Sequence, residues 1–340
     1  MLLIDAVYIH ESGGKALLEY LITELKKNQR SFFLLLDKRM EAKAEKIIAN
    51  VPYSFIEPTE KNRRRFYLHL PKGIDVVLCF ANVPPPVHII EISVFVFMQN
   101  VLLLADFADR NLHSFVSKIQ FYLKKCYIRF LNKANYQWLV QTPSMQFRLE
   151  SAIGVLPTKI HVTPFFAESY SLPSAGKHDS FKFIYVADGV PHKNHNILLE
   201  AWLLLKEKYG DTPELHLTVP DTYPVILNKI ALLSQKGLRI HNHGVCTYNE
   251  LNRLYAECGY LIFPSLAESF GLPLLEASMA GCGVLASDLP FVYEIVIPTN
   301  VFDPYNKEMI VKSVRDAMQS IPKSNLVISN HYKQLIQLLK

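Results

Sequence analysis

Two glutamates eight residues apart are the side chains of this sequence best suited to chemistry. Glu268 lies in a loop of small residues after the apolar run 260–263, and Glu276 follows Pro273. Proline fits the first position of a helix, where its missing N–H costs nothing, so Pro273 predicts Glu276 in the first helical turn. A strand-to-helix junction presents unpaired N–H groups and a partial positive charge, which suit a phosphate. The junction therefore predicts a site for a sugar together with a phosphate, because carboxylates accept hydrogen bonds from hydroxyl groups.

The same residues have a purely structural interpretation. A first-turn glutamate stabilises a helix by about 0.3–1 kcal/mol through the helix dipole, and the neighbouring apolar side chains could simply be core. However, residues 264–277 resemble the E-x7-E motif of family 4 retaining glycosyltransferases, which reads approximately P-S-x-x-E-x-F-G-L-P-x-x-E-A. The similarity continues through residues 281–288 to Glu294.

The resemblance implies roles for the residues of this motif. Glu268 would bind hydroxyls of a donor sugar and act in catalysis, and Glu276 would bind the ribose of the donor nucleotide. The backbone N–H groups that would line the donor pocket are those of Ser269, Phe270, Gly271 and Leu272.

A lysine in a second loop is a candidate for binding the donor diphosphate. Lys193 follows the strand-like run 183–187 and precedes a helical pattern, where the helix dipole slightly disfavours a cation. The segment resembles the G-R-x-x-x-x-K-G segment of the family, and still more its P-H-K-N-H variant in bacterial surface-polysaccharide transferases. It departs from the family at Asp188, which takes the place of an arginine, so a second cationic phosphate contact is in doubt. The resemblance implies that Lys193 stabilises the departing diphosphate.

Two loops near the N-terminus supply further candidates. Gly13 and Gly14 lie between the first strand and its helix, where glycines either make a tight turn or let the backbone approach a phosphate. Family 4 enzymes carry a similar pair beside the donor diphosphate. Gln99 and Asn100 end a strand and either bind acceptor hydroxyls or satisfy loop backbone.

Length and periodicity predict two α/β domains. The chain has 340 residues, of which 50% are hydrophobic, and short apolar runs alternate with helical patterns throughout. Such alternation indicates parallel sheets with helices on both faces. We expect an N-terminal acceptor-side domain over 1–165, a linker over 166–179 and a nucleotide-sugar domain over 180–340, whose last helix, 328–340, crosses back to the first. The resemblance implies a GT-B fold, in which two Rossmann-like, doubly wound domains face each other across a cleft.

Charge is concentrated in the first half of the chain. Residues 1–165 carry 21 Lys and Arg against 14 Asp and Glu, a net charge of +7, and the remainder carries −2. No acidic residue occurs between Asp109 and Glu150. A helical pattern over 111–133 contains five basic residues and apolar residues that are expected to serve a core: Lys118, Lys124, Lys125, Arg129 and Lys133, with Phe115, Ile119, Tyr122, Cys126 and Phe130. This basic helix predicts either an anionic membrane surface as partner or an ordinary helix with a solvated face.

No cofactor or metal is expected from the sequence. The five cysteines show no metal-ligand spacing, and no D-x-D pair follows a strand; His241 and His243 are a weak candidate pair. The N-terminus lacks the features of a signal peptide, and the apolar runs are far shorter than a membrane span. The expected location is therefore cytoplasmic, at the inner face of the plasma membrane if the basic helix binds it.

The resemblance implies a hexosyltransferase-type enzyme that moves a sugar from a nucleotide diphosphate-sugar to a glycan or lipid-linked glycan, with retention of anomeric configuration. Lipopolysaccharide, capsule or exopolysaccharide assembly is the expected setting, with no nucleic-acid partner. Two alternatives remain: a catalytically silent GT-B partner subunit, which Asp188 favours, and a non-hydrolysing sugar-nucleotide epimerase of the same fold.

Overall fold

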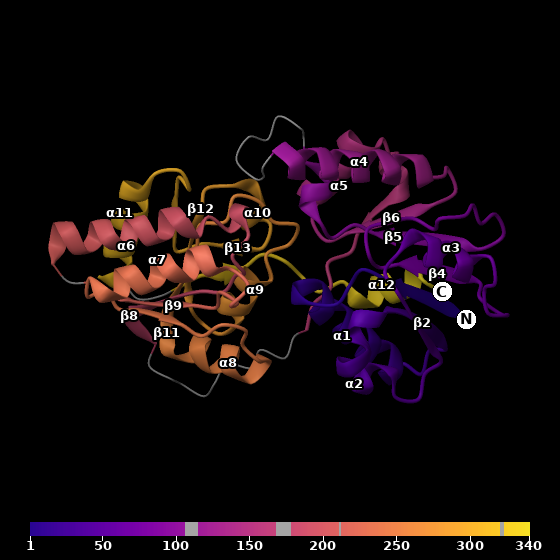
Figure 1. Cartoon of the computed structure of the whole chain (residues 1–340), viewed down its shortest axis with the longest axis horizontal. Helices are drawn as coiled ribbons and strands as arrows, with labels where there is room; N and C mark the ends of the chain where they lie inside the picture. Colours follow the sequence, from indigo (N-terminus) through magenta and orange to yellow (C-terminus); the bar gives the residue numbers. More distant parts are fainter. Residues whose placement is uncertain (106–114, 168–177, 211, 320–322) are drawn as a thin grey trace. The chain divides into compact units, whose positions relative to one another are not determined.

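The computed structural model describes residues 1–105, 115–167, 178–210, 212–319 and 323–340. These residues form two compact units (Figure 1). The first contains residues 1–105, 115–167 and 329–340, and the second contains the described residues from 178 to 328. The segment 168–177, which holds most of the expected linker, lies outside the described residues.

The first unit is built on a seven-stranded sheet with the order β3-β2-β1-β4-β5-β6-β7, in which every neighbouring pair is parallel. Its strands are β1 (Leu2–Ala6), β2 (Phe32–Asp37), β3 (Tyr53–Ile56), β4 (Val76–Cys79), β5 (Ser93–Phe97), β6 (Gln137–Val140) and β7 (Ile160–Val162). Its α-helices are α1 (Ser12–Lys27), α2 (Glu45–Ile48), α3 (Glu60–Tyr67), α4 (Phe115–Leu131), α5 (Pro143–Ile153) and α12 (Tyr332–Leu338), and its 3-10 helices are η1 (Lys38–Lys43), η2 (Val101–Leu104) and η3 (Pro157–Lys159).

The second unit repeats this plan with a six-stranded parallel sheet, in the order β10-β9-β8-β11-β12-β14, and a small antiparallel pair, β13-β15. Its strands are β8 (Asp179–Tyr185), β9 (Glu214–Leu217), β10 (Ile240–Asn242), β11 (Cys258–Phe263), β12 (Gly283–Ser287), β13 (Val296–Ile297), β14 (Asn300–Phe302) and β15 (Asn325–Leu326). Its helices are η4 (Pro191–Lys193), α6 (His195–Tyr209), α7 (Pro224–Gln235), α8 (Tyr248–Glu257), α9 (Leu272–Met279), α10 (Pro290–Tyr293) and α11 (Lys307–Met318).

Both sheets reverse their strand order once, between β1 and β4 in the first unit and between β8 and β11 in the second. This is the order of doubly wound Rossmann-like sheets, in which ligands bind beyond the carboxyl ends of the strands at the reversal. Figure 1 shows α6 and α7 on one face of the second sheet and α8 on the other. All six residues of β11 are buried, as expected for a central parallel strand covered on both faces. The expected α/β fold with two Rossmann-like parallel-sheet domains is confirmed.

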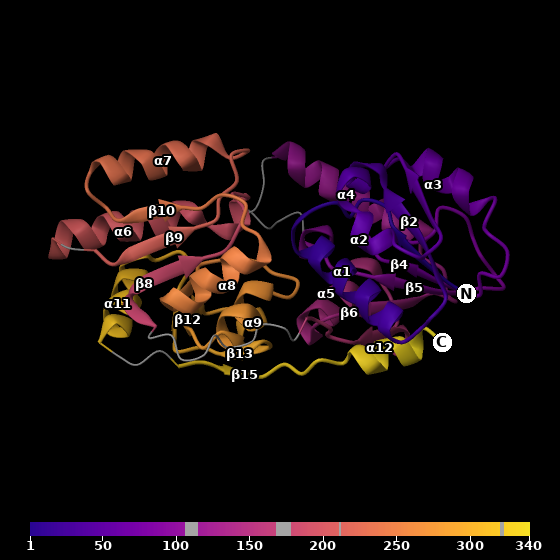
Figure 2. The same cartoon turned by 90° about the horizontal axis from the view of Figure 1, so that it is seen from below.

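The final helix α12 belongs to the first unit, as Figure 2 also shows. Asn28 donates a hydrogen bond to the Tyr332 hydroxyl (3.1 Å), and Arg30 donates one to the Ile336 carbonyl (3.2 Å). The Leu335 and Leu339 side chains are buried. Residues near the end of the chain therefore complete the core that the first residues begin.

A buried ion pair ties α3 to β1. Arg63 Nε lies 2.8 Å from Asp5 Oδ2, and both side chains are almost fully buried. The Tyr67 hydroxyl donates to the same Asp5 oxygen (2.8 Å), and Arg63 also donates to the Val83 carbonyl. Because burial and the Asp5 charge both disfavour the phenolate, the pKa of Tyr67 lies well above its ordinary value. Removing either partner of such a pair leaves an uncompensated buried charge.

Helix α8 begins with a capping box between Thr247 and Glu250. Two expectations from the sequence need correction. The first correction is that α9 begins at Leu272, with Gly271 (φ 85°) as its N-cap. Pro273 is therefore its second residue, and Glu276 lies one residue deeper than expected, in the second turn.

The second correction concerns the basic helix. The structure describes α4 over 115–131, so residues 111–114 of the expected helix lie outside the described part. Lys125 was expected among the exposed basic residues, but it is buried and its Nζ donates to the Ala105 carbonyl (3.1 Å). Ile119, Tyr122 and Phe130 were expected to serve a core, but they are exposed. The side chains of α4 that are buried against the first unit are instead Ile128 and Leu131. The buried side of the helix therefore differs from the expected one.

Candidate functional site

The structure brings Lys193 and Glu268 into direct contact. Lys193 ends η4, in the loop after β8, and Glu268 lies in the loop after β11. Since β8 and β11 are parallel neighbours at the strand reversal, both loops leave the same edge of the sheet. Lys193 Nζ lies 2.7 Å from Glu268 Oε1, and the two side chains are only 16% and 10% exposed. Two residues separated by 75 positions thus form one nearly enclosed ion pair.

Hydrogen bonds from Asn194 and to the His192 carbonyl join the Lys193 loop to two neighbouring loops. Asn194 adopts the left-handed conformation (φ 59°) and donates from Nδ2 to the carbonyls of Pro264 (3.2 Å) and Pro304 (2.8 Å). The Leu266 N–H donates to the His192 carbonyl (2.8 Å). These bonds fix three loops of the second unit around the ion pair.

Two buried hydroxyls complete this arrangement. Ser265 Oγ lies 2.6 Å from Glu268 Oε1, the oxygen that also accepts from Lys193. The Tyr185 hydroxyl donates to the Lys193 carbonyl (2.7 Å). Burial, together with the charges of Glu268 and Asp188, raises the pKa of Tyr185 well above its ordinary value, so Tyr185 remains a neutral donor.

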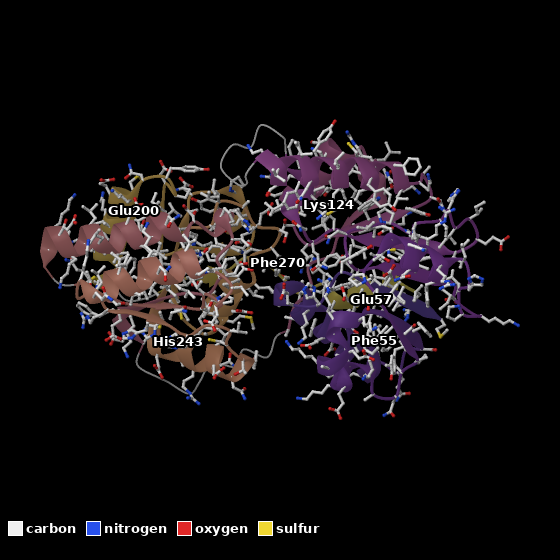
Figure 3. All side chains as sticks on the ribbon, viewed as in Figure 1. Phe55, Glu57, Lys124, Glu200, His243 and Phe270 are labelled. Atoms are coloured by element: carbon white, nitrogen blue, oxygen red, sulfur yellow. The ribbon has the colours of Figure 1, made fainter. Side chains whose placement is uncertain are left out.

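The loop after Glu268 leads into α9 through Gly271. The Leu274 N–H donates to the Gly271 carbonyl (2.9 Å), and a Cβ on Gly271 would meet the Leu274 side chain at 3.0 Å. Together with its positive φ, this contact makes glycine necessary at the position. Phe270, labelled in Figure 3, is buried beside it. Ser269 and Leu272 are half-buried, so the expected donor-pocket residues form one short turn at the start of α9.

Glu276 is buried and held by a tyrosine of another helix. The hydroxyl of Tyr255, on α8, donates to Glu276 Oε2 (3.0 Å). Since Glu276 lies in the second turn of α9, stabilisation of the first turn does not explain a carboxylate at this position. A buried carboxylate with a fixed hydroxyl partner is instead suited to accept hydrogen bonds from a ligand.

Lys193 carries the positive charge of this cluster, because His195, two residues later, is neutral. His195 begins α6, is 2% exposed and packs its ring 4.9 Å from that of Tyr185. Burial and the nearby Lys193 charge lower the pKa of His195 from 6.5 to about 3. His195 therefore adds no positive charge at neutral pH.

The candidates of the first unit follow β1 and β5, the strands on either side of β4. A Cβ on Gly14 would lie 3.2 Å from Gln99 Oε1, so a side chain at this position would press on the Gln99 amide. Gln99 Nε2 donates to the Phe80 carbonyl (2.6 Å), and its N–H donates to Asn82 Oδ1 (2.7 Å). Gly13 is exposed beside Gly14. The structure thus gathers the glycine pair and Gln99.

Asn100 has a structural task in the described chain. Its Oδ1 accepts from the Leu102 N–H (3.0 Å) and so caps η2. This bond agrees with the second interpretation of Asn100, in which its side chain satisfies the loop backbone. The bond uses the side-chain oxygen and not the NH2 group.

Over the residues that the structure describes, no group of three or more His, Cys, Asp or Glu side chains is arranged to hold a metal ion. His243, which follows β10, and His241 both pack their rings against His216 of the neighbouring strand β9. His216 Nδ1 lies 2.9 Å from His243 Nε2, and the two rings stack. Burial is the first cause of the lowered pKa of both His216 and His243.

Sequence reasoning missed three residues that hold the site. Ser265 belongs to the recognised motif but was given no role, and Asn194 neighbours Lys193 without a pattern of its own. Tyr255 had no sequence signal, because its contact with Glu276 depends on how α8 packs beside β11 and α9.

Comparison with known proteins shows what the second unit is similar to. Residues 171–334 match the family model described as "Glycosyl transferases group 1", which covers this unit almost completely. The whole chain has the fold of a glycosyltransferase from Rickettsia africae ESF-5 (TM-score 0.71, 15% identity, 94% of this chain and 88% of that one). The second unit is thus similar to group 1 glycosyltransferases, and the chain has the two-domain α/β fold of GT-B glycosyltransferase structures.

Two further proteins define what the chain resembles. The O-antigen chain mannosyltransferase RfbU of Salmonella typhimurium is 22% identical over 222 residues, which are 62% of this chain and 61% of RfbU. HepE of Anabaena, solved in complex with UDP and glucose, has the same fold (TM-score 0.67, 12% identity, 99% of this chain and 95% of that one). The chain thus aligns with somewhat less than two thirds of the length of RfbU.

We predict that the second unit becomes less stable as the pH falls below neutral, because His195 is buried in its neutral form. The unfolded chain binds this proton below about pH 6.5, whereas the folded protein does not until about pH 3. The free energy of unfolding should therefore fall by about 2 kcal/mol between roughly pH 7.5 and pH 5. Trp202 is the tryptophan of the second unit, so urea unfolding is followed by its fluorescence in a Trp138→Phe background.

The matched variants are His195→Phe, which keeps a ring in the site, and His178→Gln, which removes another histidine of the same unit. His195→Phe should abolish most of the pH-dependent loss, and His178→Gln should not. Equal pH dependence in the parent and His195→Phe proteins would show that His195 is not its source.

Proposed function

We propose that this protein is a retaining family 4 glycosyltransferase that transfers a hexosyl group from a nucleotide diphosphate-sugar to a hydroxyl acceptor. The observation that carries the proposal is the Lys193–Glu268 pair at the strand reversal, beside the start of α9. A cation, a carboxylate and helix N–H groups within one small region match the phosphate and hydroxyl groups of such a donor.

In this proposal, binding of the donor separates Lys193 from Glu268, and each then contacts a different part of the donor. The diphosphate takes the place of Glu268 as partner of Lys193, and the released carboxylate accepts hydrogen bonds from the sugar. Ser265 stays bonded to Glu268 Oε1 and keeps the carboxylate in place during the exchange. Lys193 then stabilises the charge that grows on the diphosphate as the glycosidic bond breaks, which is often the largest catalytic contribution.

The resemblance to family 4 supplies the remaining proposed donor contacts. Glu276, held by Tyr255, would bind the ribose, and the turn 269–272 would offer its N–H groups. Gly13 and Gly14 remain proposed contacts of the diphosphate. Gln99 is the better acceptor contact of the first unit, because its Oε1 points toward the glycine pair, whereas Asn100 caps η2.

The comparisons favour a mannosyl group as the sugar and an O-antigen or related surface polysaccharide as the product, since RfbU is described as an O-antigen chain mannosyltransferase. We place the reaction in the cytoplasm, at the inner face of the plasma membrane, with a lipid-linked glycan as acceptor. Among the described helices, none is long and apolar enough to cross a membrane.

Titration and product analysis separate this proposal from its alternatives. A transferase should bind GDP-, UDP- or dTDP-sugars and release the nucleotide diphosphate only when an acceptor is present, and NMR of the product should show a retained anomeric configuration. A silent GT-B subunit should bind no nucleotide, and an epimerase should convert the donor without an acceptor. Either of these last results would refute the proposal.

We predict that Lys193→Ala lowers kcat about 100- to 1000-fold, the cost of roughly 2.7–4 kcal/mol that follows removal of one preorganised charge-stabilising group. The donor KM should rise less than kcat falls. The measurement is donor kinetics, with Lys182→Ala, at a surface ion pair of the same unit, as the matched control.

Glu268→Gln tests the other half of the pair. It should also lower kcat, while the affinity for the free nucleotide diphosphate stays nearly intact, because the carboxylate contacts the sugar. Near-normal kcat in Lys193→Ala would show that the role carried over from the family is wrong, and would favour a rebuilt or silent site around Asp188.

We predict that Glu276→Gln raises the donor KM with little change in kcat, because a ribose contact is made equally in the ground and transition states. Tyr255→Phe should act in the same direction. A lost hydrogen bond to a charged group costs about 1.5–3 kcal/mol, or roughly 10- to 150-fold in KM. Tyr248→Phe, on the same helix α8, is the control. A fall in kcat at unchanged KM would instead assign Glu276 to the chemical step.

We predict that turnover survives EDTA, because Lys193 and the N–H groups at the start of α9 supply the electrostatic stabilisation that a metal provides in other transferases. The rate is measured before and after chelation and after addition of Mg²⁺ or Mn²⁺. Loss of activity that either ion restores would contradict the proposed metal-independent site.

A further inference from the structure

Three histidines share one face of the second sheet at its edge strand. His216 of β9 is paired in register with His241 of β10, the last strand in the sheet order. His243, labelled in Figure 3, lies two positions after His241 and so faces the same side. The His216 ring centre is 5.1 Å from that of His241 and 5.2 Å from that of His243. The proposed donor contacts use none of these imidazoles.

Two of the three are in polar contact, and we call His216 and His243 the histidine pair. His216 Nδ1 lies 2.9 Å from His243 Nε2, and His216 Nε2 lies 3.5 Å from Glu214 Oε2. Because a carboxylate attracts an N–H group, Glu214 assigns the proton of His216 to Nε2 and leaves a lone pair on Nδ1. His216 therefore directs this lone pair toward His243. Histidines that bind metal ions are oriented by carboxylates in the same way.

The backbone that carries the histidine pair is fixed by hydrogen bonds. Asn242 Oδ1 accepts from the Val219 N–H (2.8 Å), and Asn242 Nδ2 donates to the Val219 carbonyl (2.9 Å). The His243 N–H donates to the Leu217 carbonyl (2.8 Å). The His216 side chain is buried, whereas His243 is exposed. One imidazole is thus held in place, and the other can turn without moving the chain.

The charges around the histidine pair favour a cation. Burial is the first cause that lowers the pKa of both imidazoles, so both are neutral at neutral pH, as metal ligands must be. The negative charges of Glu250 and Glu257, on α8, act on His243. Lys182, the basic residue beside Glu214, lies 3.8 Å from its carboxylate. The surroundings therefore offer more negative than positive charge.

We propose that the histidine pair binds a divalent transition-metal ion such as Zn²⁺, which bridges β9 and the end of β10. Zn²⁺ binds imidazole nitrogen at about 2.0–2.1 Å in tetrahedral geometry, so two ligand nitrogens lie about 3.3 Å apart. The two nitrogens of the pair need to separate by about 0.4 Å, which a small turn of the exposed His243 ring supplies. The proton of His243 moves from Nε2 to Nδ1, and none is released.

The ligand set defines the class of ion. Two imidazoles leave the other coordination positions to water, in agreement with the finding that no three-ligand group occurs among the described residues. Nitrogen ligands favour Zn²⁺, Ni²⁺ and Cu²⁺, whereas Mg²⁺ and Ca²⁺ prefer oxygen. The sequence suggested His241 as the partner of His243, but the His241 ring stacks on His216 instead. The pair is therefore an open site that fills reversibly from solution.

The bound ion would tie the edge strand β10 to the sheet. This inference is independent of the proposed function, because β9 and β10 lie on the other side of β8 from β11 and its Glu268 loop. Chelation of the ion would leave the Lys193–Glu268 pair in place, so the expected survival of turnover in EDTA is unaffected.

The test is urea unfolding of the Trp138→Phe protein near neutral pH, followed by Trp202 fluorescence, in metal-free buffer and at increasing Zn²⁺ concentration. An ion that binds only the folded protein raises the urea midpoint as its concentration rises. Zn²⁺ should therefore raise the midpoint, whereas Mg²⁺ and Ca²⁺ at the same concentrations should not. Absence of a shift with Zn²⁺, or an equal shift with Mg²⁺, would overturn the proposal.

Variants of the cluster separate its members. His243→Gln changes an exposed side chain, so it should keep the metal-free midpoint of the parent and lose the zinc-dependent shift. His216→Gln should also lose the shift, which is compared with its own metal-free midpoint. Glu214→Gln should weaken zinc binding about 10- to 100-fold, as the loss of an orienting carboxylate does. The matched controls are His241→Gln and Cys246→Ser, a half-buried thiol close in sequence, and both should keep the shift.

Each control has an outcome that would overturn the proposal. Loss of the shift in His241→Gln would assign the ion to His241 and His243, and loss in Cys246→Ser would assign it to a thiol. Nucleotide titration of the same proteins keeps the two proposals distinct. A zinc-dependent shift without nucleotide binding would refute the proposed function and leave the metal site standing, whereas nucleotide binding without a zinc-dependent shift would do the reverse.

Discussion

The parallel pairing of β8 with β11 is the constraint on which the candidate site depends. It places strands that are some 75 residues apart in sequence side by side at the point where the sheet reverses its order, so both of their loops leave the same edge. Asn194 then fastens these loops to each other and to the loop that follows β14. Its left-handed backbone directs one amide at two carbonyls, which few other side chains could do at this position.

Within this frame, the electrostatics of the site rest on very few groups. Lys193 and Glu268 compensate each other with little solvent access, which is necessary because either charge alone would be costly to bury. His195 is kept neutral, and Tyr185 is kept protonated, by burial beside the same pair. In the proposed reaction, the donor diphosphate would replace the carboxylate of Glu268 as the partner of Lys193.

Much of the fold was predictable because it depends on local patterns. Apolar runs of strand length alternate with helical periodicity, and the capping residues Thr247 and Glu250 are visible in the sequence and present in the structure. Strand β3 lacks such an apolar run, because it lies at the sheet edge and its Tyr53 faces solvent. The start of α9 was misplaced by one residue, because a left-handed Gly271 allows the helix to begin before Pro273.

What could not be predicted depends on contacts between distant elements. Tyr255 meets Glu276 only because α8 and α9 both pack beside β11, and no local pattern encodes that meeting. The orientation of α4 is a similar case. Its apolar residues satisfy more than one helical stripe, and only packing against the first unit decides which stripe is buried.

The return of α12 to the first unit makes the second unit, in effect, an insertion within the first. Tyr20, Asn28 and Arg30 contact residues that lie about 300 positions later in the chain. During synthesis, the N-terminal sheet would therefore emerge, and the second unit could fold completely, while the surface awaiting Leu335 and Leu339 was still uncovered. The first unit, most of which is translated before the second, is consequently the last to finish folding, and removal of residues 332–340 should be felt in its core rather than in the second unit.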